Sequence, residues 1–589
     1  MVRTYLKVAI AAIAAFAFAS CNNDLKVDSV QVSGETELVF TQEDTADKTV
    51  TFSANTDWTV SYEAAWLEVT PTSGVAAEEI VLTVSLKETK APVKRSDVVV
   101  INAGTAKAEV TVTQEATVFA EAIEVKGNHR VVAGYTTTLS VEATPAGAEI
   151  DAPVFETSDA AVVTVDANGV VTAVAVGEAV VTVTAGELVK EFWMEVTETF
   201  VTDGVGTTYT FADLAAIEYS GVEGANGEYV VTADIMVSET DIIALGDAKR
   251  VVFNDAVRLG VEGMADFVAT EQISFAAARE AIPDPIYFTG DVEGAGSFKN
   301  IAFNGVTMRY FGAADLTVED CVFTGVVDTE PCISLGGGGL VTVSNCDFTE
   351  NAYPAINGAA NIVTPLIFQD NYLYKNSLSA KNKPQINVTV GGQSGVKILR
   401  NVVIGPAEVT TNGGIAVSNM MSLVGSHVVE ISDNEVSDNR YGIALYGQMN
   451  AVINDNVLMN NNYESNPMNG GSGVSLYGIG VQNVYMSGNH IEGHFWGITN
   501  IKYYANPNLN LGNLTEGDNY NPGGNVFVNN GNGGVLYDLY NNSTADVMAQ
   551  GNIWNVDVQD EESIEGVIYH KVDQSNLGLV TFMPAGSAE

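Results

Sequence analysis

A repeated pair of short apolar runs around a polar corner constrains this sequence more than any other feature. The segment Val429–Gly447 reads VEISDNEVSDNRYGIALYG, in which alternating apolar residues break at Asp433-Asn434 and then resume. Related segments recur through the second half of the chain: LIFQDNYL, VKILRNVV, AVINDNVLM, VYMSGNHIE and VMAQGNIW. Alternation is the period of a β-strand. A recurring unit of roughly 20–36 residues that cannot bury its own apolar side chains indicates a solenoid of stacked strands.

One corner position can be aligned through the repeats. It is occupied by Cys321, Cys346, Asn371, Asn401, Asn434, Asn456, Asn489, Asn525 and Asn552. An asparagine that points inward at a corner can bond the backbone of the coils above and below it, so we predict a ladder of these side chains. The expected fold class is all-β, with a right-handed parallel β-helix. Over about residues 200–589 the repeat resembles the pectin-lyase-like superfamily, a resemblance that specifies fold much better than activity.

The charge balance argues against two classes of partner. Of 589 residues, 73 are Asp or Glu and 26 are Lys or Arg, which gives a formal net charge of −47. Such a surface repels nucleic acid and anionic bilayers. It also disfavours uronate-rich or highly sulfated substrates unless a cation or a local basic patch intervenes. We therefore expect no nucleic-acid partner.

The N-terminal segment determines the expected location. Residues 1–20 have the form of a signal peptide, with basic residues before an apolar run that ends in small residues. These small residues before Cys21, and Asn22-Asn23-Asp24 after it, resemble a bacterial lipobox. The resemblance implies that Cys21 is the lipidated N-terminus, that residues 21–34 form a tether, and that the protein is attached to the outer membrane at the cell surface. The alternative is an ordinary signal peptide with an incidental cysteine.

Two β-sandwiches are expected after the tether. Residues 35–116 contain NTDWTV, WLEVTPTSG and VTVTQ and closely resemble the BACON domain of exported Bacteroidetes proteins. Residues 119–198 contain FETSD, VTVD and GVVTA and resemble bacterial Ig-like domains of group 2, which usually act as spacers. The BACON resemblance implies carbohydrate binding, for which Trp58 and Trp66 could be platforms. Packing is the favoured role of both, because each lies in an alternating strand.

The remaining residues, 199–589, are expected to form the β-helix. Its irregular N-terminal cap covers about residues 199–300, and its C-terminal cap covers about residues 561–589. The segments 211–220 and 265–282 could contain short helices that cover the open end of the solenoid.

Long inserts interrupt the repeats, and such loops usually carry binding residues. They are rich in Asn, Gly, Pro and Tyr, and they span residues 375–385, 460–472 and 503–524.

The outward residues beside the ladder are the candidate site. If Asn434 points inward, alternation turns Glu435 outward, and on the second strand it turns Tyr446 outward. Tyr477 is the counterpart of Tyr446 on the next coil, and the residues beside both are small. A shallow groove with a tyrosine wall suits the apolar face of a pyranose ring. The alternative is a pair of tyrosines that only stack on each other.

Five residues therefore form the predicted carbohydrate-binding set: Tyr446, Tyr477, Arg440, Glu435 and Trp496. Trp496 either packs at a corner of the coil or presents a platform to a sugar.

Two further clusters have more than one interpretation. His490, Glu492 and His494 could form an acid–base pair or a metal site on one outward side. Surface polar residues are the favoured interpretation, because only one coil contributes. Cys321 and Cys346 could form a disulfide, but buried cysteines stacked in the ladder are simpler. No metal site is predicted, since no Cys-x-x-Cys spacing occurs.

Catalytic signatures of enzymes with this fold do not stand out. A polysaccharide lyase needs a basic residue and a means of neutralising the uronate carboxylate, and the candidates Lys397, Arg400, Arg440 and Lys502 are scattered. Glycoside hydrolysis needs two carboxylates. The polygalacturonase-like motifs Asn-Thr-Asp, Asp-Asp, Gly-His-Gly and Arg-Ile-Lys do not occur in residues 199–589. The sequence identifies no catalytic residue, and it favours a protein without catalytic activity over an enzyme.

The favoured hypothesis is a cell-surface lipoprotein that binds polysaccharide through its β-helix, with the Ig-like domains as spacers. The alternatives are an anchored polysaccharide lyase or glycoside hydrolase with a non-standard active site, and an adhesin-like surface protein. Binding requires no cofactor. Calcium is a candidate because of the Asp/Asn-rich corners, although no segment matches a calcium-binding loop. Expected partners are polysaccharide, the membrane through the N-terminal lipid, and neighbouring glycan-uptake proteins.

Overall fold

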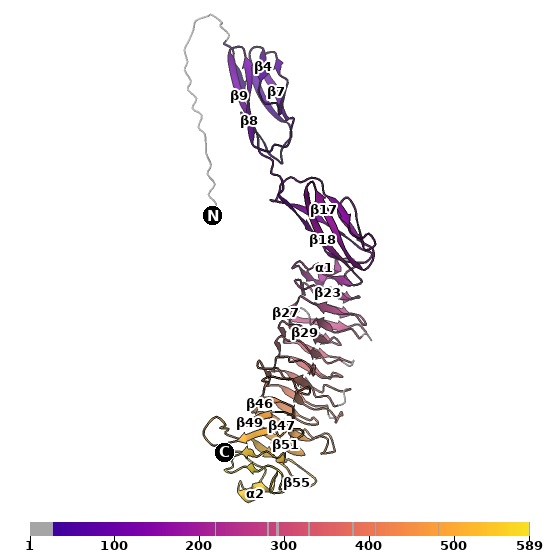
Figure 1. Ribbon diagram of the computed structural model, residues 1–589, viewed down its shortest axis with the longest axis vertical. Coiled ribbons are helices and arrows are strands. Elements are labelled where there is room, and N and C mark those ends of the chain that lie inside the picture. The colour runs from indigo at the N-terminus through magenta and orange to yellow at the C-terminus, as the bar shows by residue number, and fades with distance from the viewer. Residues whose placement is uncertain are drawn as a thin grey trace. The chain divides into compact units, whose positions relative to one another are not determined.

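The computed structural model describes residues 27–217, 219–279, 282–289, 294–327, 330–379, 382–406, 408–480 and 482–587. The predicted signal peptide, Cys21 and the first part of the tether lie outside these residues. Within them the chain is almost entirely β-structure, with two short helices, α1 (Phe211–Ala215) and α2 (Glu561–Glu565) (Figure 1). Neither of these helices has the length and apolar character that a membrane-spanning helix needs.

The first domain consists of two antiparallel-rich sheets. One has the order β1 (Val30–Val32), β3 (Lys48–Ala54), β7 (Ala77–Leu86), β5 (Leu67–Thr70). The other has the order β2 (Glu37–Phe40), β9 (Ala106–Gln114), β8 (Arg95–Ala103), β4 (Trp58–Ser61), β6 (Ser73–Gly74). Trp58 is buried and meets Phe52 edge to face at 5.0 Å, which confirms its packing role. Trp66 is half-buried, with the Arg95 guanidinium 4.8 Å from its ring.

The second domain contains three smaller sheets. Their orders are β10 (Ala122–Lys126), β13 (Ser140–Thr144); β11 (Arg130–Val132), β18 (Leu188–Thr197), β17 (Gly177–Ala185), β14 (Val154–Thr157); and β12 (Thr136–Thr138), β16 (Val170–Ala173), β15 (Val163–Val165). The alternating burial along β17 and β16 matches a strand with one face on a core.

From β19 onward, the described strands build two long sheets that run along a solenoid. The 14-stranded sheet has the order β19 (Phe200–Val201), β23 (Ile235–Val237), β26 (Leu259–Val261), β28 (Ile286–Phe288), β30 (Met308–Tyr310), β33 (Ile333–Leu335), β36 (Ile356–Gly358), β39 (Ile386–Thr389), β42 (Ile415–Ser418), β45 (Ile443–Tyr446), β48 (Ser472–Gly478), β51 (Trp496–Lys502), β56 (Leu539–Asn542), β58 (Ile568–Tyr569). We call this the short-strand sheet. Its strands pair in parallel throughout, as between β45 and β48.

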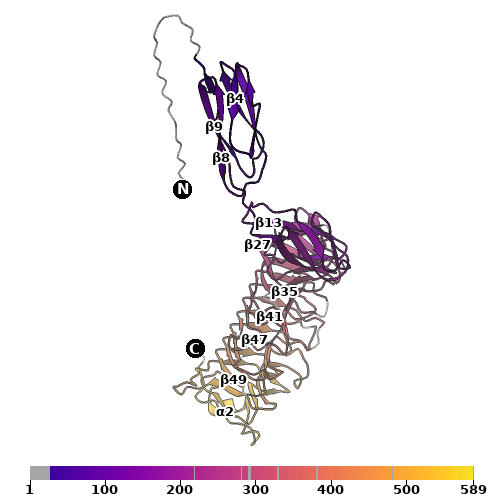
Figure 2. The same ribbon diagram turned by 45° about the horizontal axis from the view of Figure 1, so that its top comes forward.

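The 25-stranded sheet covers two further sides of each coil, and we call it the double sheet. Its order is β20 (Thr208–Thr210), β21 (Val222–Ala225), β22 (Glu228–Val231), β24 (Ile242–Ala244), β25 (Arg250–Phe253), β27 (Met264–Ala277), β29 (Ala295–Asn304), β31 (Leu316–Glu319), β32 (Val322–Thr324), β34 (Val341–Ser344), β35 (Asp347–Thr349), β37 (Leu366–Gln369), β38 (Tyr372–Tyr374), β40 (Val396–Leu399), β41 (Val402–Ile404), β43 (Val428–Ser432), β44 (Glu435–Ser437), β46 (Met449–Asn454), β47 (Val457–Met459), β49 (Gln482–Ser487), β50 (His490–Glu492), β52 (Asn508–Gly512), β53 (Val526–Val528), β57 (Val547–Ala549), β59 (Val580–Thr581). A separate hairpin joins β54 (Gly531–Asn532) to β55 (Val535–Leu536). Figure 2 shows β35, β41 and β47 following one another along the solenoid.

The predicted corner ladder is present. The Asn401 backbone N–H donates to Asn434 Oδ1 at 2.9 Å, and the Asn434 N–H donates to Asn456 Oδ1 at 3.0 Å. The same bond links each later rung as far as Asn552. The residue before the rung lies in the left-handed region, with φ of 60° at Asp433 and 55° at Asp455. Asp, Asn and Gly tolerate this conformation best, which explains the recurring Asp-Asn and Gly-Asn pairs.

Cysteines occupy the first two rungs as free thiols. Cys321 and Cys346 are both buried, and the Cys321 N–H points at Cys346 Sγ at 3.4 Å. The Cys346 N–H then donates to Asn371 Oδ1 at 2.9 Å, where the amide rungs begin. The stacked interpretation of these cysteines is confirmed, and the disulfide alternative is wrong.

A second ladder, which the sequence analysis missed, lies five residues downstream of the first. Its members are Asn351, Asn376, Asn439, Asn461, His494 and Asn530. Pro406 stands at this position after Asn401, and Gln385 from the 375–385 insert fills the gap by bonding to both Asn376 and Asn439. The fixed spacing of five residues was the available signal.

The structure confirms one prediction about irregular segments and corrects two. A helix forms within 211–220, where α1 starts at a Thr210–Asp213 capping box. The helix predicted within 265–282 is wrong, because strand β27 pairs in parallel with β29 over most of its length. Partner strands on both sides override the helical tendency of its alanines. The predicted insert 503–524 also contains a strand, β52.

The second ladder ends on a buried carboxylate, Asp538. Its oxygens accept hydrogen bonds from Asn530 Nδ2 at 3.2 Å and from the Asn555 N–H at 2.8 Å. Burial raises the pKa of Asp538 to about 7. The folded state therefore binds this proton more tightly than the unfolded state, whose carboxyl titrates near its ordinary pKa of 3.8.

We expect this group to make stability fall as the pH rises from about 4 to about 7, with no further change above that range. Other carboxylates with lowered pKa values, such as Asp370, act in the opposite direction. The measurement is therefore the difference in the free energy of unfolding between wild type and Asp538→Asn at each pH. A difference that does not vary between pH 4 and 7 would rule out this role for Asp538.

Candidate functional site

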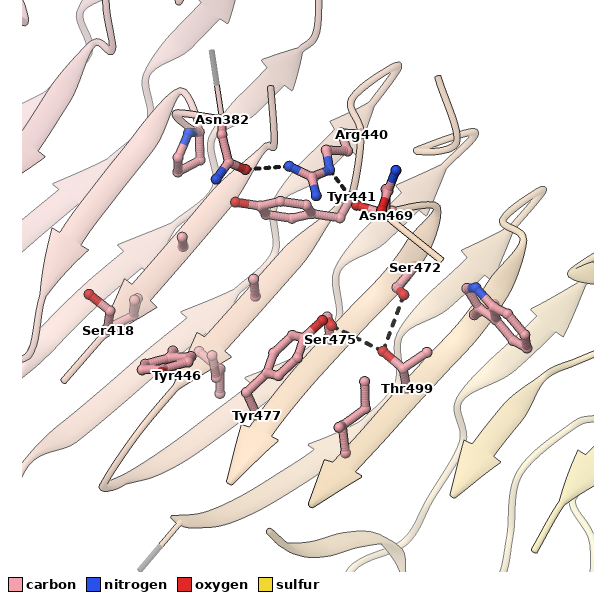
Figure 3. A pocket seen from close by; sticks show the side chains of 18 of the residues that line it. Asn382, Ser418, Arg440, Tyr441, Tyr446, Asn469, Ser472, Ser475, Tyr477 and Thr499 are labelled. Carbon is pink, nitrogen blue, oxygen red and sulfur yellow. Dashed lines mark hydrogen bonds between the residues drawn. The ribbon is translucent and has the colours of Figure 1, made fainter. Parts of the chain in front are cut away.

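A groove of about 420 Å³ lies on the outer face of the short-strand sheet. Its floor comes from strands β42, β45, β48 and β51, and its sides come partly from two of the inserts. In Figure 3, Arg440 and Tyr441 lie along one side, Tyr446 and Tyr477 lie along the other, and Ser475 and Thr499 lie next to Tyr477.

The floor is hollow because small side chains occupy one outward column. Parallel pairing aligns Ala416 with Ala444, Ala444 with Ser475, and Ser475 with Thr499. The hydroxyls here are linked to one another. Thr499 Oγ1 donates to Ser475 Oγ at 3.0 Å and lies 3.2 Å from Ser472 Oγ.

The first wall follows the neighbouring outward column. Pairing aligns Ser418 with Tyr446, and Tyr446 with Tyr477. The two tyrosine rings are 6.2 Å apart and inclined by 40°, and the Tyr503 ring lies 6.3 Å from that of Tyr446. Tyr446 and Tyr477 are half-buried. These rings are therefore in contact with each other and also available to a ligand.

Arg440 holds the opposite wall together. Its Nε donates to the Asn469 carbonyl at 2.6 Å, while Nη1 bonds Asn382 Oδ1 and the Thr411 carbonyl, the latter at 3.4 Å. These three partners belong to three separate segments between strands. The Arg440 guanidinium therefore fixes the position of loops that lie up to 58 residues away in sequence.

Tyr441 completes this wall. The Arg440 guanidinium lies 6.0 Å from its ring, and a Cβ at Gly413 would overlap that ring, so glycine is needed there. Burial raises the pKa of Tyr441 to about 12. The phenol is consequently neutral at physiological pH.

Trp496 lies at the C-terminal end of the groove. Its Nε1 donates to the Pro467 carbonyl at 2.8 Å, and its ring centroid is 4.8 Å from those of Tyr537 and Tyr540. Trp496 is half-buried and lines the groove. Trp496 therefore packs against its tyrosine neighbours and also presents part of its ring to the groove.

Four members of the predicted set line this groove, and Glu435 does not. Glu435 is on β44, in the double sheet, whereas Tyr446 is on β45, in the short-strand sheet. Alternation separates inward from outward positions, but it does not say which sheet a strand joins. The corner between Ser437 and Ile443 turns the two outward faces away from each other.

The predicted grouping of His494 with His490 and Glu492 is also wrong. His490 and Glu492 pair at 2.8 Å on the double sheet. His494 is a buried rung of the second ladder, where Nδ1 accepts from the Asn461 N–H and Nε2 donates to the Leu458 carbonyl. Burial lowers the pKa of His494 to about 4, so its ring is neutral at physiological pH.

The scattered basic candidates stay outside the groove, apart from Arg440. Lys397 pairs with Glu430 at 3.3 Å, and Arg400 forms two bonds to Asp370 at 2.7 and 2.8 Å. Lys502 is not among the lining residues. Across the described part of the chain, no group of three His, Cys, Asp or Glu side chains is arranged to hold a metal ion.

Several lining residues were not identified from the sequence. Tyr441 lies in a corner and Tyr540 lies on a strand of the repeat. The repeat defines which side of these segments faces outward, so the sequence could have predicted both positions. Asn382 and Asn469 come from inserts, whose paths have no repeat to predict them. None of the described lining residues is an Asp or a Glu.

Three family models match consecutive parts of the chain. The Viral BACON domain matches residues 30–117, the Bacterial Ig-like domain (group 2) matches residues 119–196, and the Right handed beta helix region matches residues 304–514. The sequence matches no curated protein.

Similar solved structures cover only parts of the chain. The Bacteroides ovatus GH5 xyloglucanase in complex with a XXXG heptasaccharide is 22% identical over 16% of this chain and 20% of its own, with a TM-score of 0.13. The S-layer protein SbsC, domains 5-6, is 15% identical over 29% of this chain and 97% of its own, with a TM-score of 0.13. Invasin, a bacterial integrin-binding protein, is 14% identical over 29% of this chain and 39% of its own, with a TM-score of 0.17. This chain thus spans about a fifth of the xyloglucanase. In chain order, the sequence thus matches a BACON domain, a group 2 bacterial Ig-like domain and a right-handed β-helix region, and the last match falls within the parallel β-sheet solenoid.

Proposed function

We propose that the groove on the short-strand sheet binds polysaccharide. The observation that carries the proposal is the half-buried wall of Tyr446 and Tyr477 beside a floor of small residues. A pyranose ring has an apolar C–H face that packs on an aromatic side chain, while its hydroxyls need polar partners. Ser418 and Asn387 supply such partners at the edges of the groove.

Binding without turnover fits the lining better than catalysis does. Glycoside hydrolysis uses two carboxylates that are roughly 5–9 Å apart, and the described lining residues include no carboxylate. A tyrosine that acts as a base needs a pKa near the working pH. The raised pKa of Tyr441 argues against that role.

The proposal includes a location. With Cys21 lipidated, the protein would be anchored in the outer membrane at the cell surface, where polysaccharide and neighbouring glycan-uptake proteins are the partners. No cofactor is required for this function, and calcium is an additive to test rather than a necessary component. We expect Cys21→Ser to move the protein from the membrane fraction to the soluble fraction. Retention of this variant in the membrane fraction would contradict the lipid anchor.

Native electrophoresis through gels that contain polysaccharides tests the proposal. We expect at least one polymer of a broad panel to retard the wild-type chain. Ala444→Trp should abolish that retardation, because the new ring fills the floor of the groove. The matched control is Val452→Trp, which adds the same ring at an exposed position on the double sheet. Equal retardation of both variants would place binding elsewhere. Unsaturated products or new reducing ends would indicate an enzyme instead.

A further inference from the structure

We infer that the ligand of this groove is an uncharged glycan rather than a uronate-containing or sulfated one. The inference rests on the proposed function, since it names the class of polysaccharide that the same groove takes. It comes from the single charged residue among the described lining residues, Arg440, and from what its guanidinium already contacts.

Three of the five N–H groups of the Arg440 guanidinium are committed to the protein. Recognition of a carboxylate by arginine is strongest when two nitrogens donate together, either Nε with Nη2 or Nη1 with Nη2. The one Nε hydrogen is directed at the Asn469 carbonyl. The two Nη1 hydrogens are directed at Asn382 and Thr411. A carboxylate could bind either pair of nitrogens only if one of the hydrogen bonds that fix the loops were broken.

Among the described residues of the 375–385 insert, the lysines do not replace it. Lys383, which follows the lining residue Asn382, lies 5.8 Å from the Tyr353 ring and is not itself a lining residue. Lys375 from the same insert lies 3.6 Å from Glu408. The net charge of −47 adds a repulsive field for any polyanion that approaches.

The polar groups that line the groove are those that suit hydroxyls. Ser475 and Thr499 on the floor are neutral hydroxyls, and the amides of Asn387 and Asn542 both donate and accept. Each sugar hydroxyl also both donates and accepts. A carboxylate accepts only, and here it would lose its hydration and meet a single cation, Arg440, whose paired donor sites already bond the loops. The lining therefore matches the neutral ligand and penalises the charged one.

Matched polymers test the inference with the full chain. The probes are a β-glucan, a galactan and a glucomannan, each beside its own C6-oxidised derivative, in which primary alcohols have become carboxylates. We expect at least one neutral polymer to bind, its oxidised form to bind more weakly by roughly tenfold or more, and the affinity for the neutral form to be unchanged by added salt. Ala444→Trp is the control in which the groove is blocked. Only binding that this variant loses is attributed to the groove.

The possible failures are distinguishable. If the oxidised polymers bind as well as the neutral polymers or better, the inference is overturned and the proposed function stands. If no polymer in either series shows binding that Ala444→Trp removes, the proposed function itself fails, and this inference fails with it.

Discussion

Replacing Tyr446 and Tyr477 together by alanine should weaken polysaccharide binding about 100-fold. Each residue is half-buried beside the small-residue floor, and the two ring centroids lie 6.2 Å apart on neighbouring strands. Loss of a stacking aromatic from a binding site typically costs about 1–2 kcal/mol, and each 1.4 kcal/mol is tenfold in affinity. Isothermal titration with a polymer that retards the wild-type chain measures the change.

The chain contains a matched control for this experiment. Tyr372 and Tyr374 form a stacked pair with ring centroids 6.3 Å apart, on strand β38 of the double sheet. Tyr372→Ala with Tyr374→Ala removes the same chemical groups from outside the groove, so we expect less than a twofold change. If the two double variants bind equally well, the tyrosine wall is not the binding surface.

Asn434→Ala should destabilise the β-helix by about 3 kcal/mol. The amide is fully buried, and its Oδ1 accepts from the Asn401 N–H while Nδ2 donates to the Ile398 and Ser432 carbonyls. Truncation leaves the Asn401 N–H and one N–H of the Asn401 amide without this acceptor inside the solenoid, and each buried unpaired group costs about 1–3 kcal/mol. Calorimetry is the suitable measurement, because the β-helix and the sandwiches can unfold in separate transitions.

Asn483→Ala is the matched control for the ladder. Asn483 also bonds two neighbouring asparagines, Asn450 and Asn508, but it does so on the outer face of β49, where water can replace it. We expect a change of about 0.5 kcal/mol or less there. Equal destabilisation by the two variants would mean that the buried ladder contributes no more than a surface amide row.

The first ladder was predictable because its signal is local. A residue that tolerates positive φ followed by an inward asparagine recurs in the sequence, and both properties belong to neighbouring residues. The second ladder carries the same signal at a spacing of five residues, but Gln385 and His494 replace asparagine in it and Pro406 interrupts it. Because the residue type varies at these positions, the second ladder is not evident from a search for recurring asparagines.

The groove was predictable only in part. Alternation placed Tyr446 and Tyr477 on the outside, and parallel stacking brought them together. It could not assign Glu435 to a different sheet, because that depends on the angle of a corner. It also could not predict that Arg440 contacts Asn382 across 58 residues of sequence. Such contacts depend on how the inserts fold over the coil, which no repeat specifies.

The most direct test of the groove as a glycan site is a crystal structure of the full chain with a bound oligosaccharide. The ligand should be prepared from a neutral polymer that retards the wild-type protein. We expect its sugar rings to lie against Tyr446 and Tyr477, above Ala444 and Ser475, with Arg440 still bonded to Asn382 and Asn469. An oligosaccharide seated on the first domain against Trp66, or on the double sheet, with the groove empty, would contradict the proposed site.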